Sequence, residues 1–448
     1  MSFRSWDRMT TAVLFLTLLM PLHLAAQLGT TVAVADASTA APQARPVAFD
    51  ELRRLALERN AELLAVRQEI AVARGLLTQS QLRPNPGLDV MLESGRPLGS
   101  PGERTFEVSY AHTFELGGKR DRRIDVGRIG VEMAELEVAD RERLLTVEIR
   151  TRYADALAAA RNLATLAQVA ELNDQGYRVV ERRVTEGEAP AVERSLMQSE
   201  LGRVKADRLM AAATTERTLS EIKLSAGFPM SEAIRLGGDL SVPPVLGSLD
   251  ELIARALESR PDLSASRQQR LRGESAVRLS QAERTPNVIG LARYTQSDTQ
   301  FNALGLSNSG QLIPLRDTDH TLTFGISIPL QLFNRNQGTI AAEQAQLEAS
   351  RHRQDFAEQR VRVEVAAAYT RYVAARQAQE IFDQEVVRQA QQSVRTFRTS
   401  YELGELPLMD LIQEQRRLIE IEKAYTDILK EHYVARAALE AAVGGDLR

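Results

Sequence analysis

Cysteine is absent from this sequence, and its absence removes several classes of function at once. Without a thiol the chain has no disulfide, no thiolate metal site, no cysteine nucleophile and no amino-terminal cysteine to carry a lipid. Aromatic residues are also scarce, at 5% of 448 residues, which is little for a large globular core. The formal net charge of -4 argues against nucleic acid as a partner, because phosphate binding requires a basic surface.

Motifs that carry chemistry are missing as well. The sequence contains no Gly-x-Ser-x-Gly elbow, no Walker loop and no Rossmann fingerprint in the right context. The five histidines stand apart from one another, without the spacing of a zinc site: His23, His112, His320, His352 and His432. We therefore predict that the protein is not an enzyme and holds no cofactor and no dedicated metal site.

Long hydrophobic runs are confined to the amino-terminal end. Residues 1–26 combine a basic start, an apolar run from Ala12 to Leu24 and small residues before a cleavage point, which is typical of a secretory signal. A second possible cleavage point follows Ala37. A membrane-anchoring helix is the alternative, but the run is shorter than the roughly 20 residues needed to span a bilayer. We predict export, followed by an extended segment over residues 27–47.

The remaining sequence contains an internal duplication. Asp50-Glu51-Leu52 recurs as Asp250-Glu251-Leu252, and Gly187-Glu188-Ala189-Pro190 recurs as Gly404-Glu405-Leu406-Pro407. In the second pair an acidic residue follows three positions later, Glu193 in one half and Asp410 in the other. Such recurrence marks a duplicated structural unit. It predicts a first repeat over residues 48–227, a linker over 228–248, a second repeat over 249–444 and a short tail over 445–448.

Each repeat is predicted to contain one very long helix. Lys119–Glu186 and Arg335–Leu403 lack internal proline, and each would run about 100 Å at 1.5 Å per residue. The helix after each Gly/Pro turn returns only about half that distance. We expect Leu249–Glu283 to complete the helix Ala191–Ala226. We likewise expect the amino-terminal helix, Phe49–Leu82, to complete the helix from Leu408 to Ala442.

Two strands are predicted in each repeat, at about residues 87–114 and about residues 287–330. Apolar and polar residues alternate there, most clearly from Thr321 to Leu330, and the second pair encloses an enlarged loop from Asp298 to Asp319. Such alternation suits a strand between lipid and a polar lumen, although a half-buried strand in a soluble sheet shows the same pattern. Four strands cannot close a membrane barrel, so a spanning sheet would need three or more copies of the chain.

The segments that end each strand pair carry a family resemblance. Residues 115–120 read Glu-Leu-Gly-Gly-Lys-Arg, and residues 332–338 read Leu-Phe-Asn-Arg-Asn-Gln-Gly. With the duplicated order of elements and the repeated Gly-x-x-Pro-x-x-acid turn, the chain resembles the TolC-type outer-membrane efflux proteins over nearly its whole mature length. Both junctions are similar to those of the CzcC/CusC branch, which serves heavy-metal RND pumps.

The resemblance implies a mostly α fold with a small membrane β-barrel contribution, four strands per chain and long coiled-coil helices. It implies a homotrimer in the outer membrane of a Gram-negative bacterium, in contact with lipid and extending into the periplasm. A periplasmic membrane-fusion adaptor and an inner-membrane RND pump would be its partners. The duct would be passive, and heavy-metal cations of the cobalt, zinc and cadmium or the copper and silver type would be its cargo.

The resemblance also assigns roles to residues. Adaptor-docking tips fall on Gly187, Glu188, Pro190, Gly404, Glu405 and Pro407. The periplasmic aperture falls on Asp410, with Gln413 weakening any acidic ring, and on Glu193 as a restraint on the closed state. Strand-to-helix turns fall on Gly117, Gly118, Asn334 and Gly338.

More ordinary interpretations stand beside these roles. Glycine and proline end helices anywhere, and acids are favoured at any helix amino terminus by the helix dipole. Within the same class, a drug-efflux or type I secretion duct is the alternative function. From another class, the chain would be a soluble periplasmic coiled-coil scaffold.

Overall fold

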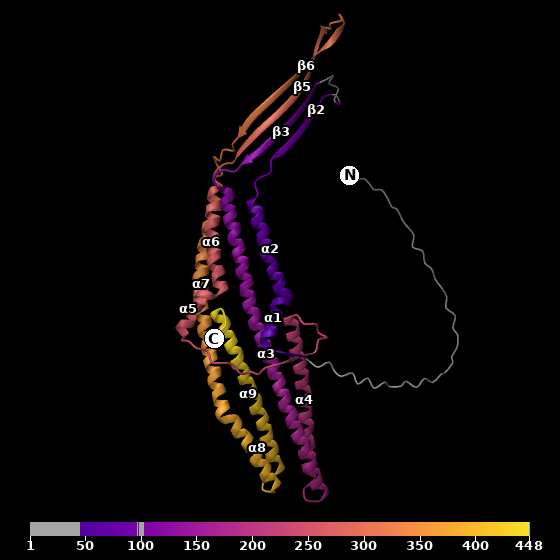
Figure 1. The fold of residues 1–448 in the computed structure, drawn as a ribbon, viewed down its shortest axis with the longest axis vertical. Helices are drawn as coiled ribbons and strands as arrows, with labels where there is room; N and C mark the ends of the chain where they lie inside the picture. Colours follow the sequence, from indigo (N-terminus) through magenta and orange to yellow (C-terminus); the bar gives the residue numbers. More distant parts are fainter. Residues whose placement is uncertain (1–44, 96, 98–102, 448) are drawn as a thin grey trace, which may run out of the picture. The chain divides into compact units, whose positions relative to one another are not determined.

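The computed structural model describes residues 45–95, 97 and 103–447, which all lie in one compact unit, Ala44–Arg448. The predicted export signal over residues 1–26 and most of the extended segment over 27–47 lie outside the described residues. Figure 1 shows the order of helices and strands along the chain.

The first repeat runs from two short helices through a strand pair to a long helical hairpin. Its elements are β1 (Arg45–Val47), α1 (Phe49–Arg59), α2 (Ala61–Gln81), β2 (Gly87–Ser94), β3 (Arg104–Phe114), α3 (Lys119–Thr185) and α4 (Ala191–Ala226). At 1.5 Å per residue the 67 residues of α3 extend about 100 Å, as the uninterrupted sequence predicts.

The second repeat follows the same order. After the linker strand β4 (Ile234–Leu236), its elements are α5 (Leu249–Ser259), α6 (Pro261–Ala282), β5 (Val288–Leu306), β6 (Leu312–Ser327), α7 (Gln337–Ile381), the π-helical turn η2 (Phe382–Val386), α8 (Val387–Glu402) and α9 (Leu408–Val443). The long helix expected over Arg335–Leu403 is therefore interrupted by one π-helical turn.

The four long strands form one antiparallel sheet in the order β2-β3-β5-β6 (Figure 1). A separate parallel pair joins β1 to β4, which lies in the predicted linker. The expected loop from Asp298 to Asp319 is largely strand, because β5 and β6 stay paired beyond Asp298 and turn only between Leu306 and Leu312. The sequence prediction of a loop there was wrong.

Both expected helices that precede the strands are broken in two. In the first repeat Asn60 leaves the helical conformation, and its side-chain oxygen accepts a hydrogen bond from the backbone of Leu63 at 3.0 Å. In the second repeat the break falls at Arg260, directly before Pro261. Proline disfavours helical backbone in the preceding residue, so this break was predictable from the sequence.

Each break receives the carboxyl end of a returning helix from the same repeat. Asn60 donates from its side-chain amide to the carbonyl of Ser225, near the end of α4, at 3.0 Å. Ser259 donates to the carbonyl of Val443, at the end of α9, at 2.7 Å. The end-to-end partners are thus α4 with α1 and α2, and α9 with α5 and α6. The sequence prediction had assigned these partners the other way round.

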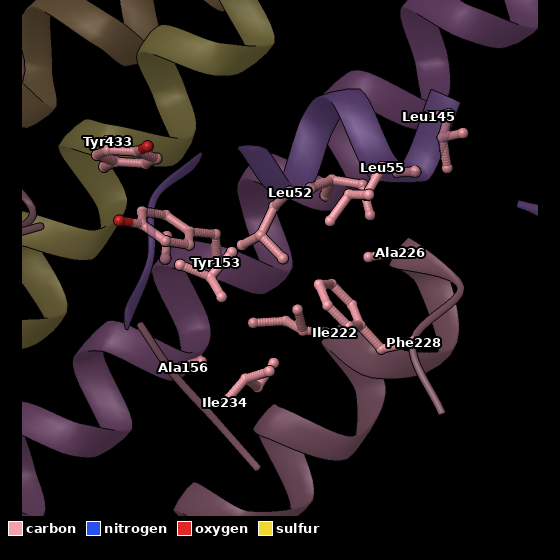
Figure 2. Close-up of a cluster of buried hydrophobic side chains, with 14 of the residues drawn as sticks. Leu52, Leu55, Leu145, Tyr153, Ala156, Ile222, Ala226, Phe228, Ile234 and Tyr433 are labelled. Atoms are coloured by element: carbon pink, nitrogen blue, oxygen red, sulfur yellow. The ribbon is translucent and has the colours of Figure 1, made fainter. Parts of the chain in front are cut away.

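Buried apolar side chains gather where these helix ends meet. Figure 2 shows one such cluster, in which Leu52 of α1, Leu145 and Tyr153 of α3 and Ile222 of α4 converge. Burying a leucine or isoleucine completely stabilises a fold by about 1.5–3 kcal/mol. A matching cluster, with Leu252, Leu263 and Leu439, forms at the second break. The two repeats are therefore anchored at their helix breaks.

Candidate functional site

One face of the four-stranded sheet is apolar and uncovered. The ladder places Leu88 beside Tyr110, Tyr110 beside Ala292 and Ala292 beside Phe324 in a single row. The next row, Val90, Val108, Tyr294 and Leu322, is equally apolar. Phe324 is 75% exposed and Leu322 is 64% exposed, values rare for large apolar side chains in a water-soluble sheet.

The opposite face of the same strands is mostly polar. One row contains Asp89, Ser109, Arg293 and Thr323, and the next contains Met91, Glu107, Thr295 and Thr321. A third row has small residues and one leucine: Gly87, Ala111, Leu291 and Gly325. Arg293 forms a salt bridge with Glu107 at 3.1 Å on this face. Because side chains alternate along a strand, the ladder extends the predicted two-sided pattern across all four strands.

The apolar rows have a limited height. On β3 they run from Phe106 to Phe114, about 27 Å along the strand at 3.4 Å per residue. At the distal end the same face turns polar: Phe106 shares its row with Gln296 and His320, and in the next row on this face Asp298 pairs with Thr318. Tyr294 and His320 share a hydrogen bond of 2.8 Å at this boundary. These nine residues of β3 are within the roughly 9–11 that a tilted membrane-spanning strand requires.

The two predicted tips have the same turn geometry. Gly187 has φ 79° and Gly404 has φ 77°, so both adopt left-handed backbone that favours glycine. The amide of Glu188 donates to the carbonyl of Arg183 at 2.8 Å, and that of Glu405 donates to Ser400 at 2.9 Å. These bonds close a Schellman-type helix end in both repeats.

The residues after each turn begin the returning helix. Pro190 and Pro407 precede the first helical residues of α4 and α9 and have extended backbone. Side chains at the predicted tip positions are exposed: Gly187, Glu188, Pro190, Gly404, Glu405 and Pro407. The structure thus presents them to solvent, and their role in docking stays a prediction.

Glu193 and Asp410 differ in their surroundings although both lie in a first helical turn. Tyr401 of α8, only 7% exposed, donates its hydroxyl to Glu193 of α4 at 2.9 Å. Burial and this hydrogen bond raise the pKa of Tyr401 to about 12. Asp410 is half-buried in α9, and Gln413 is exposed. Glu193 therefore ties the two helical hairpins together, whereas a role for Asp410 at an aperture remains a prediction.

A second contact between the hairpins lies further from the tips, between α4 and α9, and it was not predicted from the sequence. The side chain of Glu200 in α4 is only 2% exposed and accepts hydrogen bonds from Arg203 and, at 2.6 Å, from Arg416 of α9. Burial raises the pKa of Glu200, but these guanidinium groups outweigh it and hold the pKa below its ordinary value. The sequence gives no indication that Glu200 and Arg416 are in contact, because they are far apart along the chain and each is an ordinary helical residue.

The strand-to-helix junctions differ between the repeats. Gly117 and Gly118 both have positive φ before α3, and a Cβ on Gly117 would lie 2.8 Å from the Oγ1 of Thr285. In the second repeat the left-handed residue before α7 is Asn336, with φ 60°. Asn334 accepts from the amide of Asn336 at 3.0 Å, whereas Gly338 lies inside the first turn of α7. Asn336 takes the turning role that the sequence suggested for Gly338.

Metal ligands and membrane-spanning helices are the remaining features that bear on a site. Across residues 45–95, 97 and 103–447, no three His, Cys, Asp or Glu residues cluster as a metal site would require. Over the same ranges, none of the helices has the length and apolar content needed to cross a membrane.

Comparisons with known proteins agree with this geometry. A family model described as outer membrane efflux protein matches residues 52–227 and 252–445. The cobalt-zinc-cadmium resistance protein CzcC of Cupriavidus metallidurans is 23% identical over 95% of this chain and 99% of its own length. The nickel and cobalt resistance protein CnrC of the same organism is 26% identical over 75% of this chain and 76% of its own. A crystal structure of CusC, studied for transmembrane channel formation, superposes with a TM-score of 0.70, 16% identity and coverage of 89% and 92%.

Proposed function

This chain belongs to the outer membrane efflux protein family, and from that membership we propose that it is one subunit of a passive export duct across the outer membrane. The family relationship and the TolC-like fold together make it a channel component. We propose further that the working unit is a homotrimer that extends into the periplasm.

The observation that carries this proposal is the two-faced sheet. A largely apolar face opposite a largely polar face suits strands with lipid on one side and water on the other. The outer edges of β2 and β6 have no partner strand among the described residues. A spanning sheet cannot leave backbone groups unpaired in lipid, so β6 of one copy would pair with β2 of the next.

The geometry of the helical tips supports our proposal that they dock onto a partner. Each tip offers a rigid, glycine-closed turn with an exposed acid, Glu188 in one hairpin and Glu405 in the other. A periplasmic adaptor that binds both tips would connect the duct to an inner-membrane RND pump. The tie between Tyr401 and Glu193 lies close to these turns, so adaptor binding and the arrangement of the hairpins would be coupled.

Heavy-metal cations are the cargo that the comparisons favour, because CzcC and CnrC are named for resistance to cobalt, zinc, cadmium and nickel. The described residues hold no clustered metal ligands. A duct that passes cations without holding them would leave selection and energy to the pump. Drug efflux is the second candidate, and the same experiment separates it.

We expect deletion of the gene to sensitise its host selectively to zinc, cobalt, cadmium, nickel, copper or silver, with dyes and detergents as comparison compounds. The intact gene should restore growth. Gly404→Trp should not, because it places a bulky residue in left-handed backbone at the tip.

Gly202→Trp is the matched control, since Gly202 lies within α4 on an exposed surface with no atom near its missing Cβ. Sensitivity to dyes and detergents alone would move the protein to drug efflux. Recovery of the protein as a soluble monomer in osmotic-shock fluid would contradict the duct itself and favour a periplasmic scaffold.

A further inference from the structure

The enlarged segment of the second strand pair has no role in the function proposed so far. Beyond Asp298 and Thr318, β5 and β6 pair only with each other among the described residues, because β2 ends at Ser94 and β3 begins only at Arg104. Figure 1 shows this pair continuing past the ends of β2 and β3. We call residues 301–315 the distal hairpin.

The distal hairpin is uncharged and apolar. Its 15 residues include no Asp, Glu, Lys, Arg or His, in a chain that is 26% charged. Its large apolar side chains are exposed, up to 76% for Leu306: Phe301, Leu304, Leu306, Leu312, Ile313 and Leu315. A two-stranded hairpin is only marginally stable alone in water, so a surface of this kind requires a cover.

Charged residues separate this hairpin from the apolar band of the sheet. Asp298, Arg316, Asp317 and Asp319 occupy the rows directly below it. The band below already has the strand length that one bilayer needs, and Asp298 and Arg316 lie on the same face as the band, so the membrane core is not the cover for the distal hairpin. The cover must come from beyond the membrane band.

The two faces of the hairpin are distinct. The register shifts between Gln300 and Leu304, where the extra residues are in β5 and β6 continues without an insertion. By alternation along β6, Ile313 and Leu315 therefore lie on the same face as Asp317, Asp319 and Thr321, which is the polar face of the sheet. Gly305 pairs with Ile313 and has no side chain, and Leu315 covers it: a Cβ there would lie 2.6 Å from Leu315. In the duct proposed above this face points to the lumen.

We propose that the distal hairpins of neighbouring copies pack together through Ile313 and Leu315 and narrow the outward end of the duct with an apolar ring. This inference rests on the proposed function. Rotational symmetry repeats every side chain around the axis, so acids such as Asp317 and Asp319 repel their own copies there. Only the uncharged segment can approach its copies closely, and an apolar constriction of this kind hinders ions by dewetting.

The absence of cysteine in the chain allows a clean cross-linking test. In intact cells under mild oxidation, Leu315→Cys should form a disulfide between copies, seen as a covalent pair by non-reducing electrophoresis. Leu312→Cys, on the opposite face of the same hairpin, should stay monomeric. Equal cross-linking at both positions, or none at either, would overturn the proposed contact.

A second measurement uses the intact channel in planar bilayers. The double variant Ile313→Asp with Leu315→Asp should raise the conductance of single channels several-fold, because repeated charges separate the hairpins and wet the constriction. Ile313→Leu with Leu315→Ile keeps the face apolar and should leave the conductance unchanged. Unchanged conductance in the charged variant would refute the constriction.

Failure of the underlying duct is recognised separately. Native mass spectrometry of the Leu315→Cys protein, extracted from outer membranes under reducing conditions, should show trimers. Trimers without the expected cross-link would refute the hairpin contact and leave the duct intact. Absence of trimers would refute the proposed function and this inference with it.

Discussion

At the scale of single residues, the hydroxyl of the buried Tyr401 connects the two hairpins near their tips. Tyr401 reaches from α8 to Glu193 of α4, while the guanidinium of Arg183 lies 5.4 Å from the centre of its ring. A hydrogen bond from a neutral donor to a charged acceptor contributes about 1.5–3 kcal/mol. Because it joins two hairpins, this bond restrains their relative position and does more than stabilise one helix.

We predict that Tyr401→Phe lowers the free energy of unfolding by about 2 kcal/mol near neutral pH, and that the difference from the unchanged protein shrinks as pH rises. The pKa of Tyr401 is about 12, above its ordinary value of 10.0, so its protonated form is the one that stabilises the fold. That contribution is complete below about pH 10 and is lost as pH rises toward about 12. Thermal unfolding at about pH 8 and about pH 11 measures the change.

Tyr177→Phe is the matched control, because Tyr177 bonds only to Glu181 within α3, at 3.3 Å. Tyr177→Phe should lower the free energy of unfolding only slightly at either pH. A gap between the Tyr401 variant and the unchanged protein that stays constant with pH would show that the hydroxyl does not act through its proton.

The sequence was informative for some single residues and silent for others. Gly187 and Gly404 predicted sharp turns, because glycine adopts the positive φ of such turns more readily than other residues do. Asn336 adopts the same left-handed backbone, but asparagine is common elsewhere and the nearby Gly338 was the stronger signal. The pair of Glu200 and Arg416 is separated by 216 residues along the chain, and nothing local in the sequence brings them together.

At the scale of elements, local sequence patterns predicted which helices and strands form, whereas tertiary contacts determine where some of them end. The long helix α3 and the strands β2 and β3 follow directly from apolar spacing. The break at Asn60 could not be seen in that spacing, because it depends on the carbonyl of Ser225 arriving from another helix. The loop prediction for Asp298–Asp319 failed since polar residues there still pair as strands.

The two helix breaks both bind the carboxyl end of a returning helix, but with different side chains. The loss of stability on substitution should therefore differ between them. The side chain of Arg260 is only 3% exposed and bonds to Asp262, Glu364 and the carbonyl of Ala442. We predict that Arg260→Ala lowers the free energy of unfolding by about 3 kcal/mol, because it removes a buried cation from the partly exposed Asp262 and Glu364 and from the carbonyl of Ala442. Asn60→Ala should cost about 0.5–2 kcal/mol, as loss of a helix cap does. Urea unfolding of the purified protein measures both.

Asn60→Asp refines this comparison. Aspartate keeps the acceptor for the backbone of Leu63 but cannot donate to the carbonyl of Ser225. Stability close to that of the unchanged protein would assign the role of Asn60 to capping alone. Equal losses for Arg260→Ala and Asn60→Ala would contradict the different chemistry inferred for the two breaks.

At the scale of the whole molecule, duplication was the strongest sequence signal. The two matched segments of the family model, residues 52–227 and 252–445, each contain one pair of long strands and one helical hairpin. Which helix ends meet was predicted wrongly, because equal lengths fit either arrangement and only the contacts at Asn60 and Ser259 distinguish them.

The orientation of the sheet is testable with a single charge. We predict that Phe324→Arg destabilises the assembled protein in lipid vesicles by about 2–4 kcal/mol, as a cation does near the middle of a lipid-facing strand. Thr321→Arg is the matched control on the opposite face of β6, beside Thr295, and should change stability little. Urea unfolding in vesicles measures both, and equal losses would reverse or abolish the assignment of the two faces.

The exposed sheet has a consequence for the newly made chain. Before it meets other copies, a single chain offers water a broad apolar face and two open strand edges, β2 and β6. Open edges add strands from any available chain, so crowding of unassembled copies leads to aggregation. In the trimer proposed above, productive assembly needs several copies to meet in register, and its rate would therefore rise more steeply with concentration than the rate of a pairwise encounter. The cell must either shield each chain in transit or deliver the copies together at the place where they insert.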